Sequence, residues 1–181
     1  MLKKAVLSLL SAVVVTMVAI PSRSETSDLK TGAFQVQEEL TLPASPEAVY
    51  DALTGDITGW WDHSFSEHPK KLFIEARPGG GFYEIFDDAG NGVLHATVIA
   101  ANRGKLLRFS GPLGFSGDAV NMVTTYQLAA DPAGTKLHLT CNVSGQIRDG
   151  EAQIVDAVWR HFLVERFKAY IESGAYKKHA N

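Results

Sequence analysis

Six short segments between Lys71 and Gly145 share one pattern, and this repetition constrains the fold more than any other feature of the chain. Each segment is rich in apolar and β-branched residues, and Gly, Asp, Asn or Pro separates it from the next one. The segments read KLFIEA, FYEIF, GVLHATVIAA, KLLRFSG, VNMVTTYQLAA and KLHLTCNVSG. Strands joined by such short turns pair as an antiparallel meander, and one face of that sheet must be covered by another element.

One long helical pattern, from Glu151 to about Ser173, can provide that cover. Its apolar side chains fall in one broad stripe at about 100° per residue. Ahead of the sheet, Phe34–Leu42 alternates as a further strand, and Ser45 is a suitable N-cap for a short helix. We also expect a second short helical turn that carries the Trp60-Trp61 pair. Together these elements predict an α+β fold.

The glycine-rich turn PGGG, residues 78–81, has two interpretations. A phosphate-binding loop leads from a strand into a helix N-terminus and carries a Lys-Ser/Thr pair. Here the glycines join two strand patterns and no such pair follows. The segment therefore predicts a β-hairpin.

The first 24 residues have the layout of a secretory signal peptide. Lys3 and Lys4 precede an uncharged apolar run, and small residues lead to a cleavage point near Ser24. A retained membrane anchor is the alternative, although about 16 apolar residues are just short of a spanning helix. We expect an exported, periplasmic protein with no stable membrane span after cleavage. The expected organisation is a signal peptide (1–24), a tether (25–32), one domain (33–174) and a tail (175–181).

The net charge argues against certain partners, and the cysteine content excludes an internal disulfide. Removing residues 1–24 takes away three of the 17 basic residues and none of the 20 acidic ones, so the formal net charge falls from −3 to −6. An acidic domain argues against nucleic acid and against a polybasic membrane-surface role. Cys141 is the only cysteine, so no internal disulfide can form and packing must supply the stability.

Two motifs resemble a known superfamily. The first is SPEAVYDALT followed by the Trp60-Trp61 pair, and the second is RPGGGF at Arg77–Phe82. With the KLLRFSG strand they resemble the SRPBCC (START-like) superfamily, in a branch similar to the ATPase activator of the ninety-kilodalton heat-shock chaperone and to polyketide cyclase-like domains. The resemblance covers about Phe34–Ser173. It implies a helix-grip fold, in which a curved antiparallel sheet wraps around a long C-terminal helix and an apolar cavity.

The resemblance does not determine a function, because the superfamily includes lipid carriers, hormone receptors, polyketide cyclases and chaperone activators. No shared catalytic motif of the superfamily maps onto this sequence. Chaperone activation fits an exported chain badly, because that chaperone is cytoplasmic and depends on ATP. We expect no cofactor.

Four polar residues are candidates for the interior of such a cavity. Arg166 falls near the middle of the apolar stripe, where a charge is costly unless it is paired or faces a wet cavity. Glu84 shares a strand face with Phe82 and Phe86, and this face points either to the cavity or, if Tyr83 and Ile85 face it instead, to solvent. The inward orientation is favoured, and Glu84 then needs a cationic partner such as Arg166 or Arg108. Arg108 fits the outer face of the sheet better, and His95 is a further candidate to face the cavity.

The loop WWDHSFSEHP raises the question of a metal ion. It carries His63 and His68 beside Asp62 and Glu67, but neither HxH nor HxxxH spacing occurs and no cysteine supports them. We expect no metal site. His161 is expected on the polar side of the last helix.

These features predict a non-enzymatic binder of a small hydrophobic or amphipathic molecule, of undetermined oligomeric state. The predicted cavity residues are Trp60, Trp61, Phe65, Phe82, Glu84, His95, Arg108, Trp159, Phe162 and Arg166. Of the two adjacent tryptophans, we expect one ring in the core and one at the cavity mouth. The alternative is a cyclase- or hydrolase-like enzyme with His95 or Glu84 as general base. A third interpretation, a protein-interaction module, requires a large apolar patch on the outer sheet face.

Overall fold

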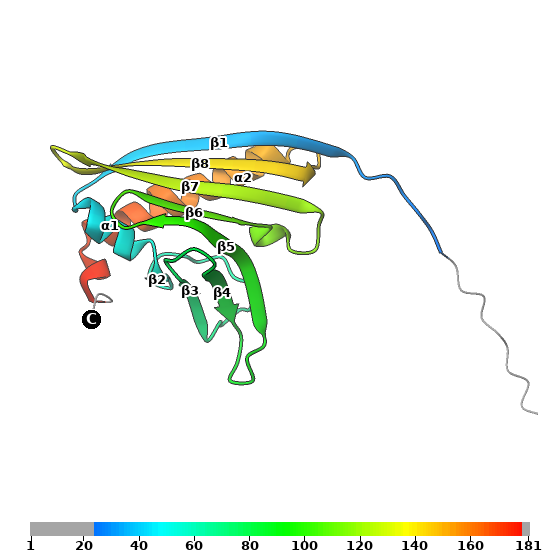
Figure 1. The fold of residues 1–181 in the computed structure, drawn as a ribbon, viewed down its shortest axis with the longest axis horizontal. Helices are drawn as coiled ribbons and strands as arrows, with labels where there is room; N and C mark the ends of the chain where they lie inside the picture. Colours follow the sequence, from blue (N-terminus) through cyan, green and yellow to red (C-terminus); the bar gives the residue numbers. More distant parts are fainter. Residues whose placement is uncertain (1–23, 179–181) are drawn as a thin grey trace, which may run out of the picture.

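Eight strands form one antiparallel sheet in the computed structural model, which describes residues 24–178 (Figure 1). The strands are β1 (Thr31–Leu42), β2 (Gly55–Asp56), β3 (Lys71–Ile74), β4 (Gly81–Ile85), β5 (Gly92–Asn102), β6 (Leu106–Gly111), β7 (Val120–Asp131) and β8 (Gly134–Gln146). Their order is β1-β8-β7-β6-β5-β4-β3-β2, so consecutive strands from β2 to β8 are neighbours. The predicted meander is confirmed, and β1 extends it by pairing with β8.

The longest helical stretch follows the sheet and lies along its face (Figure 1). It consists of α2 (Glu151–Arg160), a π-helical segment η2 (His161–Phe167) and α3 (Lys168–Glu172). Shorter helices are α1 (Pro46–Ala52), the 3₁₀ turn η1 (Leu113–Phe115) and the 3₁₀ turn η3 (Ala175–Lys178). A curved antiparallel sheet that holds one long C-terminal helix is the helix-grip arrangement, so the predicted α+β fold is confirmed.

The core lies between this helix and the inner face of the sheet. Alternating side chains of one strand point to opposite faces, so Leu107 and Phe109 of β6 are fully buried while Arg108 between them is only half-buried. On the helix, Trp159, Leu163 and Phe167 are buried against the sheet side of the molecule. Packing of these large apolar side chains stabilises the fold in place of the disulfide that the sequence excludes.

The glycine-rich turn forms the predicted hairpin. β3 and β4 pair in antiparallel register from Ile74 opposite Phe82 to Lys71 opposite Ile85. Gly79 has φ +78°, a left-handed conformation that favours glycine. The turn therefore reverses the chain between two strands and does not lead into a helix.

The expected second short helix is present in part. Gly55–Asp56 forms β2 at the edge of the sheet, and the single helical turn that carries the two tryptophans follows it. In that turn the carbonyl oxygen of Ile57 accepts hydrogen bonds from the amides of Trp60 and Trp61 at 3.2 and 2.9 Å. The backbone of Gly55 and Asp56 pairs with β3, so these two residues are not available to lengthen the helical turn.

Two of the expected segments, the signal peptide and the tail, extend beyond the described residues. The expected signal peptide falls almost entirely on residues 1–23, outside the described residues, as does the end of the expected tail, 179–181. Of the expected tether, residues 25–30 precede the sheet, but Thr31 and Gly32 already pair with β8. Over residues 24–178, none of the helices has the length and apolar character needed to cross a membrane.

Candidate functional site

A cavity of about 360 Å³ lies between the long helix, the sheet and two connecting segments. Its lining consists of Trp61, His63, Ser64, Phe65, His95, Leu113, Gly114, Phe115, Met122, Ile154, Val155, Val158, Trp159 and Phe162. Most of these side chains are apolar. Phe65 and Ile154 are 51% and 62% exposed, which places them at the mouth. A pocket with this size and composition suits a small organic molecule.

His95 reaches the cavity because β5 carries a β-bulge. Consecutive residues of β4 pair with Ala96 and Leu94, so His95 is the extra residue between them. Neighbours in a regular strand point to opposite faces, yet His95 and Ala96 are both buried while Leu94 is about half exposed. Gly111 of β6 lies against this bulge, and a Cβ there would come within 2.4 Å of the His95 carbonyl oxygen. The bulge turns an outward position into a cavity-lining one.

Glu84 is fully buried beside His95, in the inward orientation that the sequence favoured. Its Oε2 lies 3.0 Å from Nε2 of His95 and accepts the backbone N–H of Phe65 at 2.9 Å. Its Oε1 accepts the backbone N–H of Ser66 at 2.7 Å. The expected arginine partner was wrong, because an imidazole and two backbone amides satisfy this carboxylate instead.

The Glu84–His95 pair determines which atom of the imidazole is available to a ligand. A hydrogen bond to the carboxylate assigns the Nε2 proton of the neutral ring, which leaves Nδ1 as an acceptor. Within residues 24–178, no hydrogen-bond partner of Nδ1 is found. His95 therefore offers the cavity one polar atom on a ring that Glu84 holds in place.

The two adjacent tryptophans lie in different environments, as the sequence predicted. Trp60 is 1% exposed, and its Nε1 donates to the carbonyl oxygen of Ala52 at 3.0 Å. Its ring packs edge-to-face on Phe167 with centroids 4.8 Å apart. Trp61 lines the cavity and stacks on Phe162 with ring centroids 3.9 Å apart. Burial of Trp60 thus fixes the position of the next residue, Trp61, in the cavity wall.

The ten predicted cavity residues separate into three groups. Trp61, Phe65, His95, Trp159 and Phe162 belong to the lining. Trp60, Phe82 and Glu84 are buried next to lining residues, and the Phe82 ring lies 5.0 Å from that of His95. Arg108 and Arg166 belong to neither group.

Both arginines are engaged away from the lining. Arg108 lies on the outer face of the sheet, the placement that the sequence favoured, and its Nε donates to Oγ1 of Thr125 at 2.8 Å. The charge of Arg166, which lies on the apolar stripe of the helix, is paired with a carboxylate. Its Nε lies 3.1 Å from Oδ2 of Asp62 and donates to the carbonyl oxygen of Trp60 at 3.4 Å.

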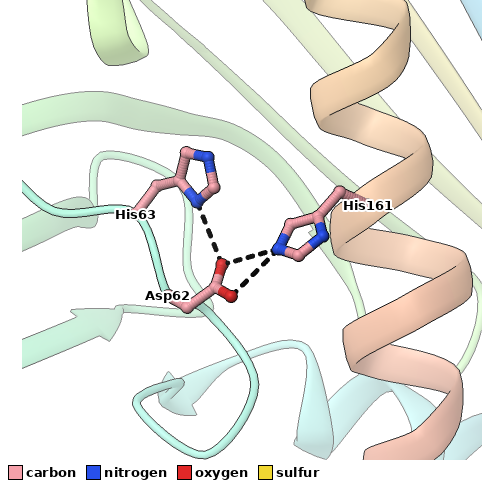
Figure 2. Close-up of side chains that lie close together, drawn as sticks. All are labelled: Asp62, His63 and His161. Carbon is pink, nitrogen blue, oxygen red and sulfur yellow. Dashed lines mark hydrogen bonds and ion pairs between the residues drawn. The ribbon is translucent and has the colours of Figure 1, made fainter.

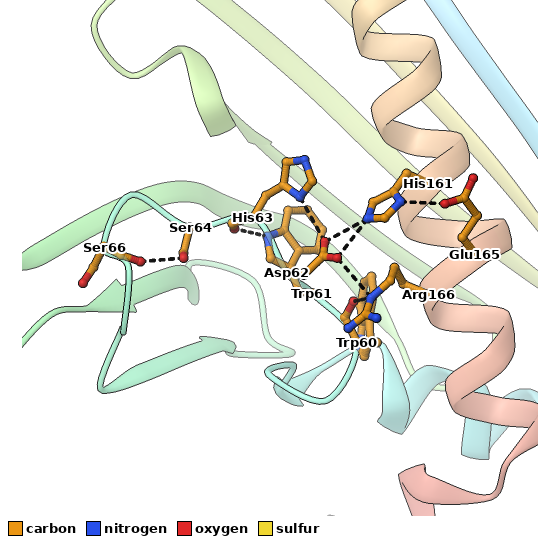
Figure 3. Close-up of polar contacts among 9 residues, drawn as sticks. All are labelled: Trp60, Trp61, Asp62, His63, Ser64, Ser66, His161, Glu165 and Arg166. Atoms are coloured by element: carbon orange, nitrogen blue, oxygen red, sulfur yellow. Dashed lines mark hydrogen bonds and ion pairs between the residues drawn. The ribbon is translucent and has the colours of Figure 1, made fainter.

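Asp62 is the centre of a polar cluster at the cavity mouth (Figures 2 and 3). Its Oδ1 lies 3.0 Å from Nδ1 of His63, and its Oδ2 lies 2.9 Å from Nε2 of His161. The other nitrogen of His161, Nδ1, lies 2.8 Å from Oε2 of Glu165 (Figure 3). The loop after Trp61 and the long helix are thus joined by charged side chains.

These contacts shift two pKa values in opposite directions. Partial burial alone would raise the pKa of the Asp62 carboxyl, but hydrogen bonds from His161 and His63 and the charge of Arg166 lower it below its usual range. Hydrogen bonds to Glu165 and to Asp62 raise the pKa of His161. Both shifts favour the charged forms and therefore the ion pair.

The π-helical segment explains how the helix brings two side chains to one carboxylate. In an α-helix, residues five positions apart lie about 140° apart around the axis. In η2 the hydrogen bonds run from residue i to i+5, so His161 and Arg166 lie on nearly the same side. Both side chains contact Asp62 from this segment.

Sequence reasoning missed this cluster because its members are far apart in the chain. The loop 62–68 carries two histidines and two acids close together in sequence, while His161 follows Asp62 by 99 residues. His68, the second histidine of that loop, is exposed and does not belong to the cluster. Adjacent Asp62 and His63 were visible in the sequence, but the π-helix that supplies the third member was not.

Cys141 fits its expected structural role. It is fully buried, and Oγ1 of Thr124 donates to its Sγ at 3.4 Å. Burial raises the pKa of its thiol, which disfavours the reactive thiolate.

Solved structures similar to this one come from several bacteria. An uncharacterised protein from Rhizobium leguminosarum aligns with a TM-score of 0.60 at 17% identity, over 81% of this chain and 99% of that one. A protein from Mesorhizobium loti aligns with a TM-score of 0.57 at 21% identity, over 77% of this chain and 98% of that one. The Aha1 dimer from Colwellia psychrerythraea aligns with a TM-score of 0.53 at 19% identity, over 77% and 96%. At these identities the similarity shows the fold.

The family assignment comes from the sequence itself. Among curated proteins, none matches the chain significantly. Residues 43–172, which include α1, the strands β2 to β8 and the long helix, match the family described as Activator of Hsp90 ATPase homolog 1-like protein. The chain therefore belongs to this family, the Aha1-like branch of the START-like superfamily that its two motifs and its helix-grip fold had indicated.

Proposed function

We propose that the protein binds a small hydrophobic or amphipathic molecule in its cavity, with a polar group of that molecule against Nδ1 of His95. One observation carries this proposal. The lining is mostly apolar, and its buried histidine is held through Nε2 by Glu84 while Nδ1 has no partner within residues 24–178. An apolar pocket with a few oriented polar groups is the usual form of a small-molecule site.

The aromatic side chains of the lining support a ligand with an extended apolar part. Trp61, Trp159 and Phe162 contribute three rings to one wall, and Phe65 lies at the mouth. Burial of apolar ligand surface against these rings supplies the affinity, at roughly 25 cal/mol per Å². His95 supplies the orientation.

We further propose that the protein is exported and acts in the periplasm. The support is the charge and hydropathy pattern of residues 1–24. In that compartment, binding a small apolar molecule needs neither ATP nor a cytoplasmic chaperone.

An enzyme remains the second candidate, and the His95–Glu84 pair favours it. An imidazole oriented by a buried carboxylate is the arrangement that general-base catalysis uses. In that case Nδ1 of His95 would accept a proton from a substrate in the same cavity. Turnover of the bound molecule by the wild-type protein, lost in His95→Gln, would distinguish the enzyme from the carrier.

Native mass spectrometry of the protein, expressed with its own N-terminus, tests both main proposals. We expect a mass that shows cleavage near Ser24 and a stoichiometric small-molecule adduct that organic solvent extracts. The uncleaved mass would contradict cleavage and release into the periplasm. A protein with no adduct that also fails to bind the apolar dye 8-anilino-1-naphthalenesulfonate would contradict the cavity proposal.

A matched pair of helix variants tests whether the ligand binds in the cavity. Val158 lines the cavity, whereas Val164 on the same helix is exposed and outside the lining. We expect Val158→Phe to weaken dye binding at least about tenfold, because the new ring occupies the ligand volume, and Val164→Phe to leave it unchanged. Quenching of Trp61 and Trp159 fluorescence measures the affinity. Equal affinity in the two variants would place the dye elsewhere.

A further inference from the structure

We infer that Asp62, His63 and His161 form a binding site for a divalent first-row transition metal ion of the Zn²⁺ class. The site lies at the cavity mouth and does not depend on the proposed ligand. Its three potential ligand atoms lie within 4.8 Å of one another (Figure 2). They come from two segments of the fold, the loop after Trp61 and the start of the π-helical segment η2.

The donor set selects the class of ion. Two imidazole nitrogens and one carboxylate oxygen suit Zn²⁺, Fe²⁺, Co²⁺ and Ni²⁺. Mg²⁺ and Ca²⁺ prefer sites built from oxygen ligands alone, so they fit this set poorly. The structure therefore assigns a transition metal ion and not an alkaline-earth one.

The distances fit a shared ion after small side-chain rotations. Metal–ligand bonds of about 2.0–2.2 Å place neighbouring ligand atoms roughly 3–3.5 Å apart. The Asp62 carboxylate lies 3.0 Å from Nδ1 of His63 and 2.9 Å from Nε2 of His161. The two histidine rings are tilted by 48° with centroids 5.4 Å apart, and the His63 ring also packs edge-to-face on Phe162 with centroids 4.8 Å apart. These ring contacts hold the nitrogens near their ligating positions.

Glu165 supplies the outer hydrogen bond that metal-binding histidines normally have. In such sites the ring nitrogen that does not bind the metal donates to a carboxylate or a carbonyl group. Oε2 of Glu165 lies 2.8 Å from Nδ1 of His161, so Nδ1 keeps its proton when an ion replaces the proton that Nε2 shares with Asp62 (Figure 3). Residues four apart on the helix thus provide a ligand and its orienting group.

The local charge also favours a cation. With neutral histidines, Asp62 and Glu165 contribute two negative charges and Arg166 contributes one positive charge. Arg166 lies 3.1 Å from the same Oδ2 that faces His161, so it opposes an incoming ion while it orients the carboxylate. Removal of this arginine charge should therefore increase metal affinity, a change opposite in sign to the loss of any ligand.

Three protein ligands leave at least one coordination position for water or for an anionic group. His63 is a metal ligand in this proposal and also lines the cavity. A bound ion would therefore lie beside the entrance through which a ligand passes.

Metal titration of the full chain, purified without a histidine tag and stripped with a chelator, tests the site. We expect one Zn²⁺ to bind per chain in calorimetry, and one Co²⁺ to give a visible absorption spectrum with nitrogen and oxygen coordination. His63→Ala, Asp62→Ala and His161→Ala should each weaken Zn²⁺ binding at least about tenfold. Glu165→Gln should weaken it by about 10- to 100-fold, and Arg166→Gln should strengthen it.

Two controls keep the result specific. His68→Ala removes an exposed histidine of the same loop that does not belong to the cluster, and we expect unchanged Zn²⁺ affinity. Zn²⁺ should also raise the melting temperature of the wild-type protein but not of His161→Ala, whose side chain is partly exposed and whose fold circular dichroism can verify. Absence of stoichiometric binding, or an equal loss in His68→Ala and His161→Ala, would overturn the inference.

Discussion

Two histidine–carboxylate groups, one at the cavity wall and one at the cavity mouth, differ in burial and in the elements that carry them. At the cavity wall, Glu84 and His95 are 0% and 6% exposed and belong to neighbouring strands. At the mouth, His161 and Glu165 belong to the helix, with side chains 31% and 64% exposed. The hydrogen-bond distances are similar, 3.0 Å in the buried pair and 2.8 Å in the exposed one.

Similar distances therefore do not mean similar energies. An exposed ion pair contributes about 0–1 kcal/mol, because water already solvates both charges. A buried carboxylate has lost that water, so breaking its hydrogen bonds leaves a desolvated group without compensation. The buried pair is therefore important for stability, whereas the exposed cluster can exchange a proton or an ion at little structural cost.

The largest expected effect is the difference in unfolding free energy between variants that replace Glu84 and Glu165. Glu84 accepts three hydrogen bonds on two oxygens, whereas a glutamine has one acceptor oxygen and presents its amide N–H₂ to a backbone donor. We expect Glu84→Gln to lower the free energy of unfolding by about 3 kcal/mol, and Glu165→Gln by less than about 1 kcal/mol. Urea denaturation with a chelator present measures both. Equal losses would remove the distinction between the two groups.

A pair of double-mutant cycles provides an intermediate effect. The cycle of Glu84→Gln and His95→Leu should give a coupling free energy of about 1.5 kcal/mol or more, because the hydrogen bond is charge-assisted and buried. The cycle of Glu165→Gln and His161→Leu should give less than about 0.5 kcal/mol, as for exposed helix pairs four residues apart. If the exposed pair coupled more strongly than the buried one, burial would not be the deciding factor.

The smallest effect is the titration of His161 in metal-free protein. Hydrogen bonds to Glu165 and Asp62 raise its pKa above the ordinary value of about 6.5, and the other groups that face Asp62 are the His63 ring and the Arg166 guanidinium. The resulting stabilisation is present below the unfolded-state pKa and is lost as the pH rises through the folded-state pKa. Imidazole shifts in NMR measure the pKa, and Glu165→Gln should lower it. A pKa at or below about 6.5 in the wild type would contradict the contacts.

Much of the architecture could be predicted from local pattern. The six strand segments, the hairpin at PGGG and the long helix follow from alternation, turn residues and an apolar stripe, because these depend on neighbours in sequence. The expected second short helix is limited to one turn because Gly55–Asp56 pairs with β3, and such pairing depends on residues far along the chain. In the lining, the aromatic residues Trp61, Phe65, Trp159 and Phe162 were identified because apolar periodicity indicates burial.

The polar part of the site was harder to predict. The sequence indicated that Glu84 points inward but assigned it an arginine, because a buried charge is usually balanced by another charge. The structure satisfies it with the amides of Phe65 and Ser66 and with His95. Loop amides leave no signal in a sequence, since every residue except proline has one.

By itself, the sequence determined the fold class, the family and an apolar interior with one inward-facing acid. Only the tertiary structure decided which polar groups meet. A β-bulge turns His95 into the cavity beside Glu84, and a π-helical segment brings His161 and Arg166 to Asp62. The β-bulge and the π-helical segment each add one residue to a regular repeat. They therefore change the face on which a side chain lies, while the sequence pattern used to predict that face stays the same.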